Sequence, residues 1–156
     1  MRIGRQFLRD GLHRFIAMLR SSIIAGVIFR ALFCNPGQYF RPLFMFARTE
    51  RVYALLLDNM LRVISCRELG SGSLDGVSMN IRSVVELVVN YRASRIVLAH
   101  NHPHGSIEPS HEDYTSTDML SKALGSFGVY VLDHIIVSGT ESGSIYKCNR
   151  DYRKIV

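Results

Sequence analysis

The residues best suited to chemistry are two histidines, His100 and His102, and a carboxylate, Asp113, which follows the second histidine by eleven residues. Together with Ser110 they form the pattern H-x-H-P-x6-S-x-x-D. Imidazole nitrogens and carboxylate oxygens are donor types that Zn²⁺ accepts. Three protein ligands leave a fourth tetrahedral position free for water, an arrangement typical of catalytic zinc. The pattern therefore predicts one zinc ion per chain and a metal-dependent hydrolase.

The segments around this pattern can bring the three side chains together. Residues 95–99 form a short apolar run that predicts a buried strand ending at His100, and prolines and glycine then break regular structure. Residues i and i+2 of an extended segment point the same way, so both imidazoles can face one point. Ser110 precedes an apolar pattern at helical spacing, which predicts Ser110 as N-cap and Asp113 at the third helical position.

Simpler explanations exist for each part of the pattern. An H-x-H triplet is common, and Ser110 and Asp113 could serve only as a helix cap and a first-turn acid that suits the helix dipole. Their conjunction in one strand, loop and helix favours the metal site. Asp133 and His134, in a later apolar run, are more simply explained as a buried hydrogen-bonded pair than as a second metal site.

At these residues the chain resembles a known family. The text "LAHNHPHGSIEPSHED", with "LLLD" before it and "LDHIIVSG" after it, resembles the bacterial RadC family, and the pattern is similar to the JAMM motif of MPN-domain metalloproteases. The resemblance covers roughly residues 36–144. It implies a zinc metallopeptidase in which His100, His102 and Asp113 hold the metal.

The resemblance also implies two catalytic residues. A glutamate at the start of an upstream strand, here Glu50, would activate the zinc-bound water, and Ser110 would help to stabilise the oxyanion. Such a base takes the proton from water and later passes it to the leaving amine. Considered from the residues alone, four other glutamates stay open as the base: Glu68, Glu86, Glu108 and Glu112.

The whole chain reads as an α/β protein with a mixed β-sheet flanked by helices. We expect strands at 52–57, 61–67, 95–99, 129–137 and 144–148, and helices at 81–91 and 110–125. The helix at 81–91 has a good N-cap in Asn80. The resemblance implies the same architecture, MPN (JAB)-like and also cytidine-deaminase-like, over a domain at 36–156.

Residues 1–35 are predicted to be an arginine-rich leader or packing helix. Apolar residues repeat at helical spacing between arginines, which is typical of an amphipathic helix. The apolar stretch 22–29 is only eight residues long, far short of the roughly 20 that span a bilayer. A weak membrane or partner contact, or an ill-defined start of the reading frame, are the alternatives. Full-length RadC-like proteins carry an N-terminal helix-hairpin-helix-like domain, so we expect a trimmed or standalone version.

Composition limits the remaining classes of protein. With 156 residues, 47% hydrophobic and 21% charged, the chain fits one globular domain with a substantial core. Three widely spaced cysteines indicate a reducing compartment and no disulfide framework. Together with the resemblance to the bacterial RadC family, which implies a bacterial source, they lead us to expect a cytoplasmic protein.

The net charge of +6 could suggest a nucleic-acid partner, but its distribution argues otherwise. Residues 1–50 hold eight arginines and two acidic residues, whereas the rest of the chain holds eleven basic and eleven acidic residues. The expected catalytic domain therefore has no overall basic bias.

Three functions are compatible with the sequence. The first is a zinc-dependent hydrolase that cleaves a peptide or isopeptide bond in a protein or peptide substrate. The second is a repair or recombination factor associated with DNA, which is the historical association of the RadC name. The third is a catalytically silent MPN-like scaffold. The complete motif favours the first, while the sequence leaves the substrate, the need for a partner and the oligomeric state open.

Overall fold

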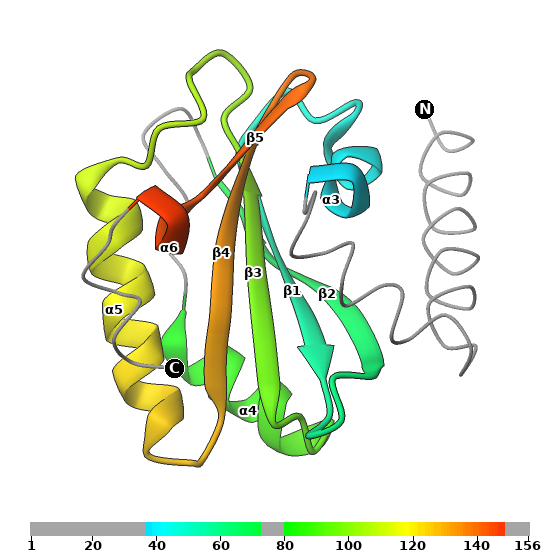
Figure 1. Ribbon diagram of the computed structural model, residues 1–156, viewed down its shortest axis with the longest axis vertical. Helices are drawn as coiled ribbons and strands as arrows, with labels where there is room; N and C mark the ends of the chain where they lie inside the picture. Colours follow the sequence, from blue (N-terminus) through cyan, green and yellow to red (C-terminus); the bar gives the residue numbers. More distant parts are fainter. Residues whose placement is uncertain (1–36, 73–79, 149–156) are drawn as a thin grey trace.

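The fold is α/β, with one mixed five-stranded sheet and helices on both of its faces (Figure 1). The computed structural model describes residues 37–72 and 80–148, so the leader expected at 1–35 lies outside the described residues. The strand order is β2-β1-β3-β4-β5. Only β3 and β4 pair in parallel; the other neighbours are antiparallel. The strands are β1 (Arg51–Leu57), β2 (Val63–Ser71), β3 (Arg95–Asn101), β4 (Tyr130–Ser138) and β5 (Glu141–Ser144).

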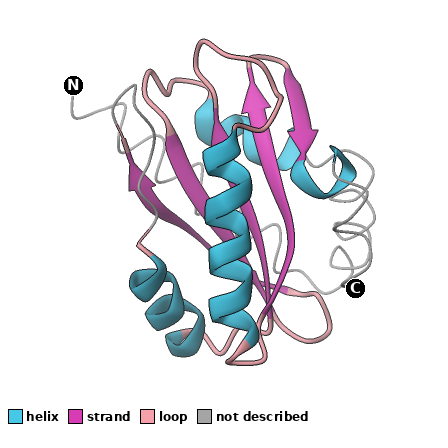
Figure 2. Cartoon of the chain, turned by 90° about the vertical axis from the view of Figure 1, so that its left-hand side faces the viewer, coloured by secondary structure: helices cyan, strands magenta, loops and turns pink. Residues whose placement is uncertain are grey.

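The helices divide between the two faces of this sheet. Helices α4 (Ile81–Asn90) and α5 (His111–Gly125) lie over one face, and α3 (Gly37–Phe44) lies on the other (Figure 2). A short helix, α6 (Ile145–Cys148), follows β5. The helix α5 connects the parallel strands β3 and β4, so its N-terminus begins beside the end of β3. A helical crossover of this kind is the usual link between parallel strands.

Apolar side chains from the strands form a core on each face. On the α3 side, Phe40 and Phe44 lie one helical turn apart and pack with Tyr53 and Leu55. On the other side, helix residues such as Val84 and Leu120 pack against Leu56 and Leu98. Because both faces are covered, the central strand β1 is buried from Val52 to Leu57.

Most of the expected elements are confirmed. Helix α4 begins after the expected cap, where the Asn80 side chain accepts a hydrogen bond from the Ser83 N–H at 3.3 Å. Strand β3 continues two residues past the expected apolar run and includes His100. Strand β2 begins later than expected, because Leu61 has a positive φ of 62° and belongs to a turn.

Two parts of the fold differ from the expectation. The strand predicted at 144–148 is wrong: β5 occupies Glu141–Ser144, and the apolar residues after it form α6. Helix α3 was not expected, because Pro42 lies inside it and proline opposes helix in a sequence pattern. Burial of Phe40 and Phe44 against the sheet compensates for that local preference.

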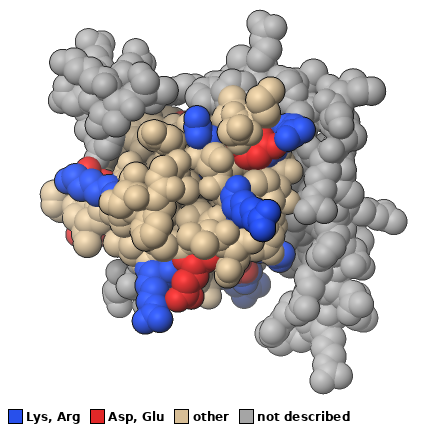
Figure 3. Space-filling model, turned by 90° about the horizontal axis from the view of Figure 1, so that it is seen from below, with Lys and Arg blue, Asp and Glu red and all other residues tan. Residues whose placement is uncertain are grey.

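The surface of the described part shows no excess of one charge. Its ten lysines and arginines are balanced by ten aspartates and glutamates. On the face in Figure 3, basic and acidic side chains are scattered among uncharged residues. Among the helices in residues 37–72 and 80–148, none has both the length and the apolarity needed to cross a bilayer.

Candidate metal centre

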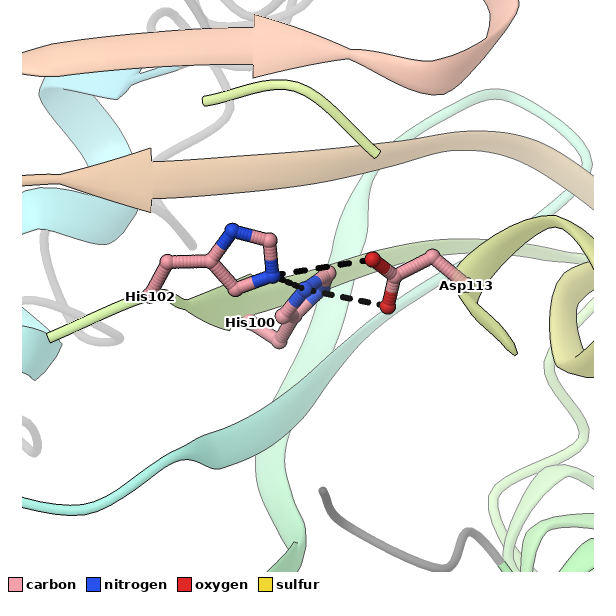
Figure 4. A group of neighbouring side chains, drawn as sticks. All are labelled: His100, His102 and Asp113. Carbon is pink, nitrogen blue, oxygen red and sulfur yellow. Dashed lines mark hydrogen bonds and ion pairs between the residues drawn. The ribbon is translucent and has the colours of Figure 1, made fainter. Parts of the chain in front are cut away.

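The structure brings His100, His102 and Asp113 together at the end of β3 and the start of α5 (Figure 4). The Nε2 atoms of the two histidines lie 2.9 Å apart. The Asp113 carboxylate lies 3.1 Å from His100 Nε2 through Oδ1 and 3.6 Å from His102 Nε2 through Oδ2. These three residues are the one group of potential metal ligands found within residues 37–72 and 80–148.

The loop after β3 fixes the orientation of His102. The backbone N–H of His102 donates to the Val137 carbonyl of β4 at 2.9 Å, and its ring Nδ1 lies 2.7 Å from the Ser106 carbonyl oxygen. A carbonyl oxygen only accepts, so Nδ1 carries the proton and Nε2 of the neutral ring is left with a free lone pair. Gly105 sits directly against this ring, since a Cβ there would lie 3.3 Å from His102 Cβ.

The N-terminus of α5 fixes the carboxylate of Asp113. Ser110 is the N-cap, as expected, and a reciprocal capping box links it to Asp113. The Ser110 hydroxyl accepts from the Asp113 N–H at 3.1 Å and donates to Asp113 Oδ2 at 2.8 Å. The Ser110 N–H also donates to Oδ2 at 2.8 Å. The cap that begins the helix therefore also holds the carboxylate over the two rings.

The charges of the site reinforce one another. The hydrogen bond with Asp113 raises the pKa of His102, although partial burial opposes this rise. Burial alone would raise the pKa of Asp113, but hydrogen bonds with His100 and His102 outweigh burial and hold that pKa well below its usual range. The carboxylate therefore stays ionised and stabilises positive charge between the rings.

These atoms fit a zinc ion. Ligands of a tetrahedral zinc at bond lengths of about 2.0–2.2 Å lie roughly 3.3 Å apart, close to the three separations seen here. The lone pair of His102 Nε2 and the carboxylate oxygens are acceptors that point to one place. Acceptors at such separations repel one another unless a proton or a cation lies between them. The donor set and its spacing suit zinc, although the structure contains no ion.

A buried hydrogen-bonded chain lies behind His100. Its Nδ1 is 2.8 Å from Nε2 of His134, whose Nδ1 is 2.6 Å from the Thr117 hydroxyl. Asp133 and His134 form the expected hydrogen-bonded pair, but through the backbone N–H of His134 and not through its ring. The Asp133 carboxylate accepts from the His134 backbone N–H and from the Ser144 hydroxyl, because alternate residues of β4 face opposite sides of the sheet.

Glu50 lies at the same edge of the sheet as the metal-ligand cluster. Strand β1 runs antiparallel to β3, and Val52 lies opposite His100. When the same register is continued for two more residues, Glu50 lies opposite His102. The charge of Glu50 contributes to the raised pKa of His102, after the larger effect of Asp113. The Glu50 side chain makes no hydrogen bond or ion pair with His100, His102 or Asp113, so its role as base stays a prediction.

Asn101, between the two histidines, holds the backbone on both sides of Glu50. Its amide oxygen accepts from the Arg51 N–H at 2.8 Å, and its amide nitrogen donates to the Thr49 carbonyl at 3.2 Å. Asn101 is buried, so its side-chain amide needs hydrogen-bond partners within the protein, and these two bonds provide them. The segment that carries Glu50 is thereby attached to the strand that carries His100.

The other candidate bases have different surroundings. Glu68 lies 3.8 Å from the Arg51 guanidinium and accepts a hydrogen bond from the Tyr53 hydroxyl. Glu86 pairs with Arg82 on the exposed side of α4. Glu108 and Glu112 are exposed on the loop and on the first turn of α5.

Sequence reasoning missed three residues that support the site: Asn101, Thr117 and the ring of His134. Each is a buried polar residue within an apolar run or on an apolar helix face. A polar residue in such apolar surroundings was the feature of the sequence that could have indicated a supporting role, because a buried polar group needs a hydrogen-bond partner. The identity of the partner depends on which strands and helices are neighbours, which the local pattern does not contain.

Comparison with known proteins places this geometry in context. The family described as "RadC-like JAB domain" matches residues 35–150. A "UPF0758 protein" of Variovorax paradoxus is 42% identical over 120 residues, which cover 74% of this chain and 53% of that protein. Similar proteins from Vibrio vulnificus and Shewanella loihica are 44% and 43% identical over 92 and 95 residues. The chain spans about half the length of the curated relatives it matches, with coverage of 53%, 41% and 42% of these three.

Proposed function

The chain belongs to the RadC-like JAB domain family, and we propose that it is a zinc-dependent hydrolase that cleaves a peptide or isopeptide bond. The observation that carries this proposal is the convergence of His100, His102 and Asp113, whose facing atoms lie 2.9–3.6 Å apart. A set of two imidazoles and one carboxylate with an open fourth position is the ligand arrangement of catalytic zinc hydrolases.

In this proposal His100 and His102 bind zinc through Nε2, and Asp113 binds through its carboxylate. Zinc held there supplies a Lewis acid that polarises a substrate carbonyl and activates a water molecule for attack. The protein contributes the orientation of the ligands. The Ser106 carbonyl turns the His102 ring, and the capping box turns the Asp113 carboxylate, so both are aligned before any metal binds.

Glu50 is the general base of the proposed reaction. Its carboxylate takes a proton from the attacking water and passes it to the leaving amine when the carbon–nitrogen bond breaks. Its position level with His102, and the effect of its charge on that histidine, support this role. The bonds from Asn101 to Thr49 and Arg51 limit the movement of the backbone that carries Glu50.

Ser110 has a second task in this proposal, beyond the helix cap. Its hydroxyl has one proton, which is donated to Asp113 Oδ2. A role in stabilising the oxyanion requires that proton to turn toward the substrate oxygen. The bond that holds the Asp113 carboxylate and the oxyanion role therefore use the same proton, whereas the helix cap uses a lone pair of the hydroxyl oxygen. Substitution of Ser110 separates the two uses of the proton by their effects on metal binding and on turnover.

A peptide and isopeptide library tests the activity. Zinc-loaded protein should cleave one or more members, while Asp113→Ala, which removes a ligand, should cleave none. The same assay with zinc-loaded Glu50→Gln identifies contaminating peptidases, because cleavage by a contaminant would be equally fast in the wild-type and Glu50→Gln preparations. Equal cleavage by the wild type and Asp113→Ala would contradict the proposal.

A further inference from the structure

The chain of hydrogen bonds behind His100 has a defined direction. We call it the His100 relay; it consists of His100, His134, Thr117 and the main-chain carbonyl of Asp113. Its members come from β3, β4 and α5, and its three links measure 2.8, 2.6 and 2.6 Å. Thr117 follows Asp113 by four residues, so both lie on the helix face that covers the sheet.

The direction is set at the Asp113 end. A carbonyl oxygen can only accept, so the Thr117 hydroxyl must donate its single proton to the Asp113 carbonyl. The Thr117 oxygen is then an acceptor toward His134. The proton in the second link therefore belongs to Nδ1 of His134, which donates to Thr117.

The donor and acceptor roles at Thr117 then determine those at His134 and His100. His134 is buried, and its two ring nitrogens face His100 and Thr117 and not a carboxylate, so a charged ring would lack a counter-ion and the neutral form is favoured. A neutral imidazole with its proton on Nδ1 has a bare Nε2. This atom accepts from His100, so His100 carries its proton on Nδ1. Its Nε2 is left unprotonated and faces His102 and Asp113.

We propose that Thr117 and His134 are positioning residues that hold His100 in its metal-binding tautomer and thereby set the affinity for zinc. This inference rests on the zinc site of the proposed function. In the opposite tautomer, His100 would present an N–H to the place where the metal binds, and the ring could not act as a ligand. The relay makes that tautomer costly, because it would leave the bare Nδ1 of His100 facing the bare Nε2 of His134, or would require the Thr117 proton to leave the Asp113 carbonyl.

The relay also joins two of the three proposed ligands. It starts at the main chain of Asp113 and ends at the ring of His100, whose Nε2 lies 3.1 Å from the Asp113 carboxylate. A displacement of the first turn of α5 therefore affects both the carboxylate and the tautomer of His100.

The test compares three threonine variants of the full chain. Thr117→Val keeps the shape of a fully buried side chain but removes the hydroxyl. Thr117→Ser restores the hydroxyl. Thr115→Val is the matched control, because Thr115 lies on the same helix and its hydroxyl also donates to the main-chain carbonyl four residues earlier, that of His111, at 3.0 Å. Unlike Thr117, its hydroxyl makes no hydrogen bond with a histidine ring.

Two measurements give independent results. Competition with a chromophoric chelator should show zinc affinity about 10–100-fold weaker in Thr117→Val, the range typical of outer-shell partners, and near the wild-type value in Thr117→Ser and Thr115→Val. Nitrogen-15 NMR of the metal-free protein in mildly alkaline buffer should show His100 Nε2 unprotonated in the wild type and in Thr117→Ser. A protonated Nε2 should become populated in Thr117→Val.

Some outcomes would overturn the inference. A His100 ring protonated on Nε2 in the metal-free wild type would contradict it directly, whether or not any variant folds. Wild-type affinity and tautomer in folded Thr117→Val would do the same. Absence of zinc binding by the wild type would instead defeat the proposed function, while the NMR measurement would still decide the direction of the relay.

Discussion

In the proposed zinc site, His102 is the residue at which we expect protons and metal to compete most directly. Its pKa is raised by the hydrogen bond with Asp113, and a ring that binds a proton more tightly gives up zinc at a higher pH. Zinc affinity should therefore begin to fall while the pH is still above about 6.5, the ordinary value for histidine. Asp113 does not contribute in this range, since its pKa lies well below the usual value.

Chelator competition between mildly alkaline and mildly acidic buffer measures this dependence. The apparent zinc affinity should decrease steadily as the pH falls. An affinity that is constant until well below the ordinary histidine pKa would show that His102 is not a zinc ligand in the form described here.

Glu50 can be separated from the ligands by one substitution. Glu50→Gln keeps the size of the side chain and removes its basicity, so turnover should drop by about 10²–10⁴-fold. Zinc content should stay at the wild-type level, because Glu50 is not part of the ligand cluster. Asp113→Ala is the contrasting variant and should lose zinc and activity together.

The measurement is the initial rate on a substrate from the library, with zinc quantified in the same samples. Full activity of Glu50→Gln would exclude Glu50 as the base. Glu108 would then be the next residue to substitute, because it lies in the loop between His102 and the start of α5.

At the scale of the element, the N-terminus of α5 has a structural task as a helix cap and, in the proposed site, a functional one. Ser110→Ala removes the cap and also one of the bonds that hold Asp113 Oδ2. Loss of an N-cap typically costs about 1 kcal/mol, so the melting temperature should fall by a few degrees. Zinc affinity should fall as well, because the carboxylate is less constrained.

Calorimetry or a thermal melt, combined with a zinc titration, checks this prediction. A further loss of turnover in the fully zinc-loaded variant would support the oxyanion role of Ser110. Unchanged stability and unchanged zinc affinity would contradict the role of the capping box in holding Asp113.

The elements that position the site were predictable because their signals are local. The apolar run of β3, the cap at Ser110 and the helical spacing after it each depend on adjacent residues. The helix α3 and the relay were not predictable in this way. Phe40 offsets the effect of Pro42 only through packing against the sheet, and His134 meets Thr117 only because β4 and α5 are neighbours. Such contacts depend on topology.

At the scale of the whole molecule, we expect the fold not to depend on a metal. Two apolar clusters cover the two faces of the sheet, and a core of this extent is stable without a metal, in contrast to a zinc finger. Chelation should therefore abolish hydrolysis while the circular dichroism spectrum stays close to that of the zinc-loaded protein.

The reactivity of the Cys66 thiol tests the same prediction more sharply. Burial raises the pKa of its thiol to about 12, so the thiol is neither accessible nor ionised in mildly alkaline buffer. In a Cys34→Ser, Cys148→Ser background, Cys66 should not react with a thiol reagent before or after chelation, but should react fully in denaturant. Rapid reaction on chelation alone would show that the metal maintains the fold.

The most direct test of the central claim is the zinc stoichiometry of the purified protein. Titration calorimetry at neutral pH should give one zinc ion per wild-type chain. His102→Ala should bind zinc far more weakly, because it removes one of three convergent ligands while the strands and helix that carry the others stay intact. No stoichiometric binding by the wild type, or equal binding by His102→Ala, would contradict a zinc site formed by His100, His102 and Asp113.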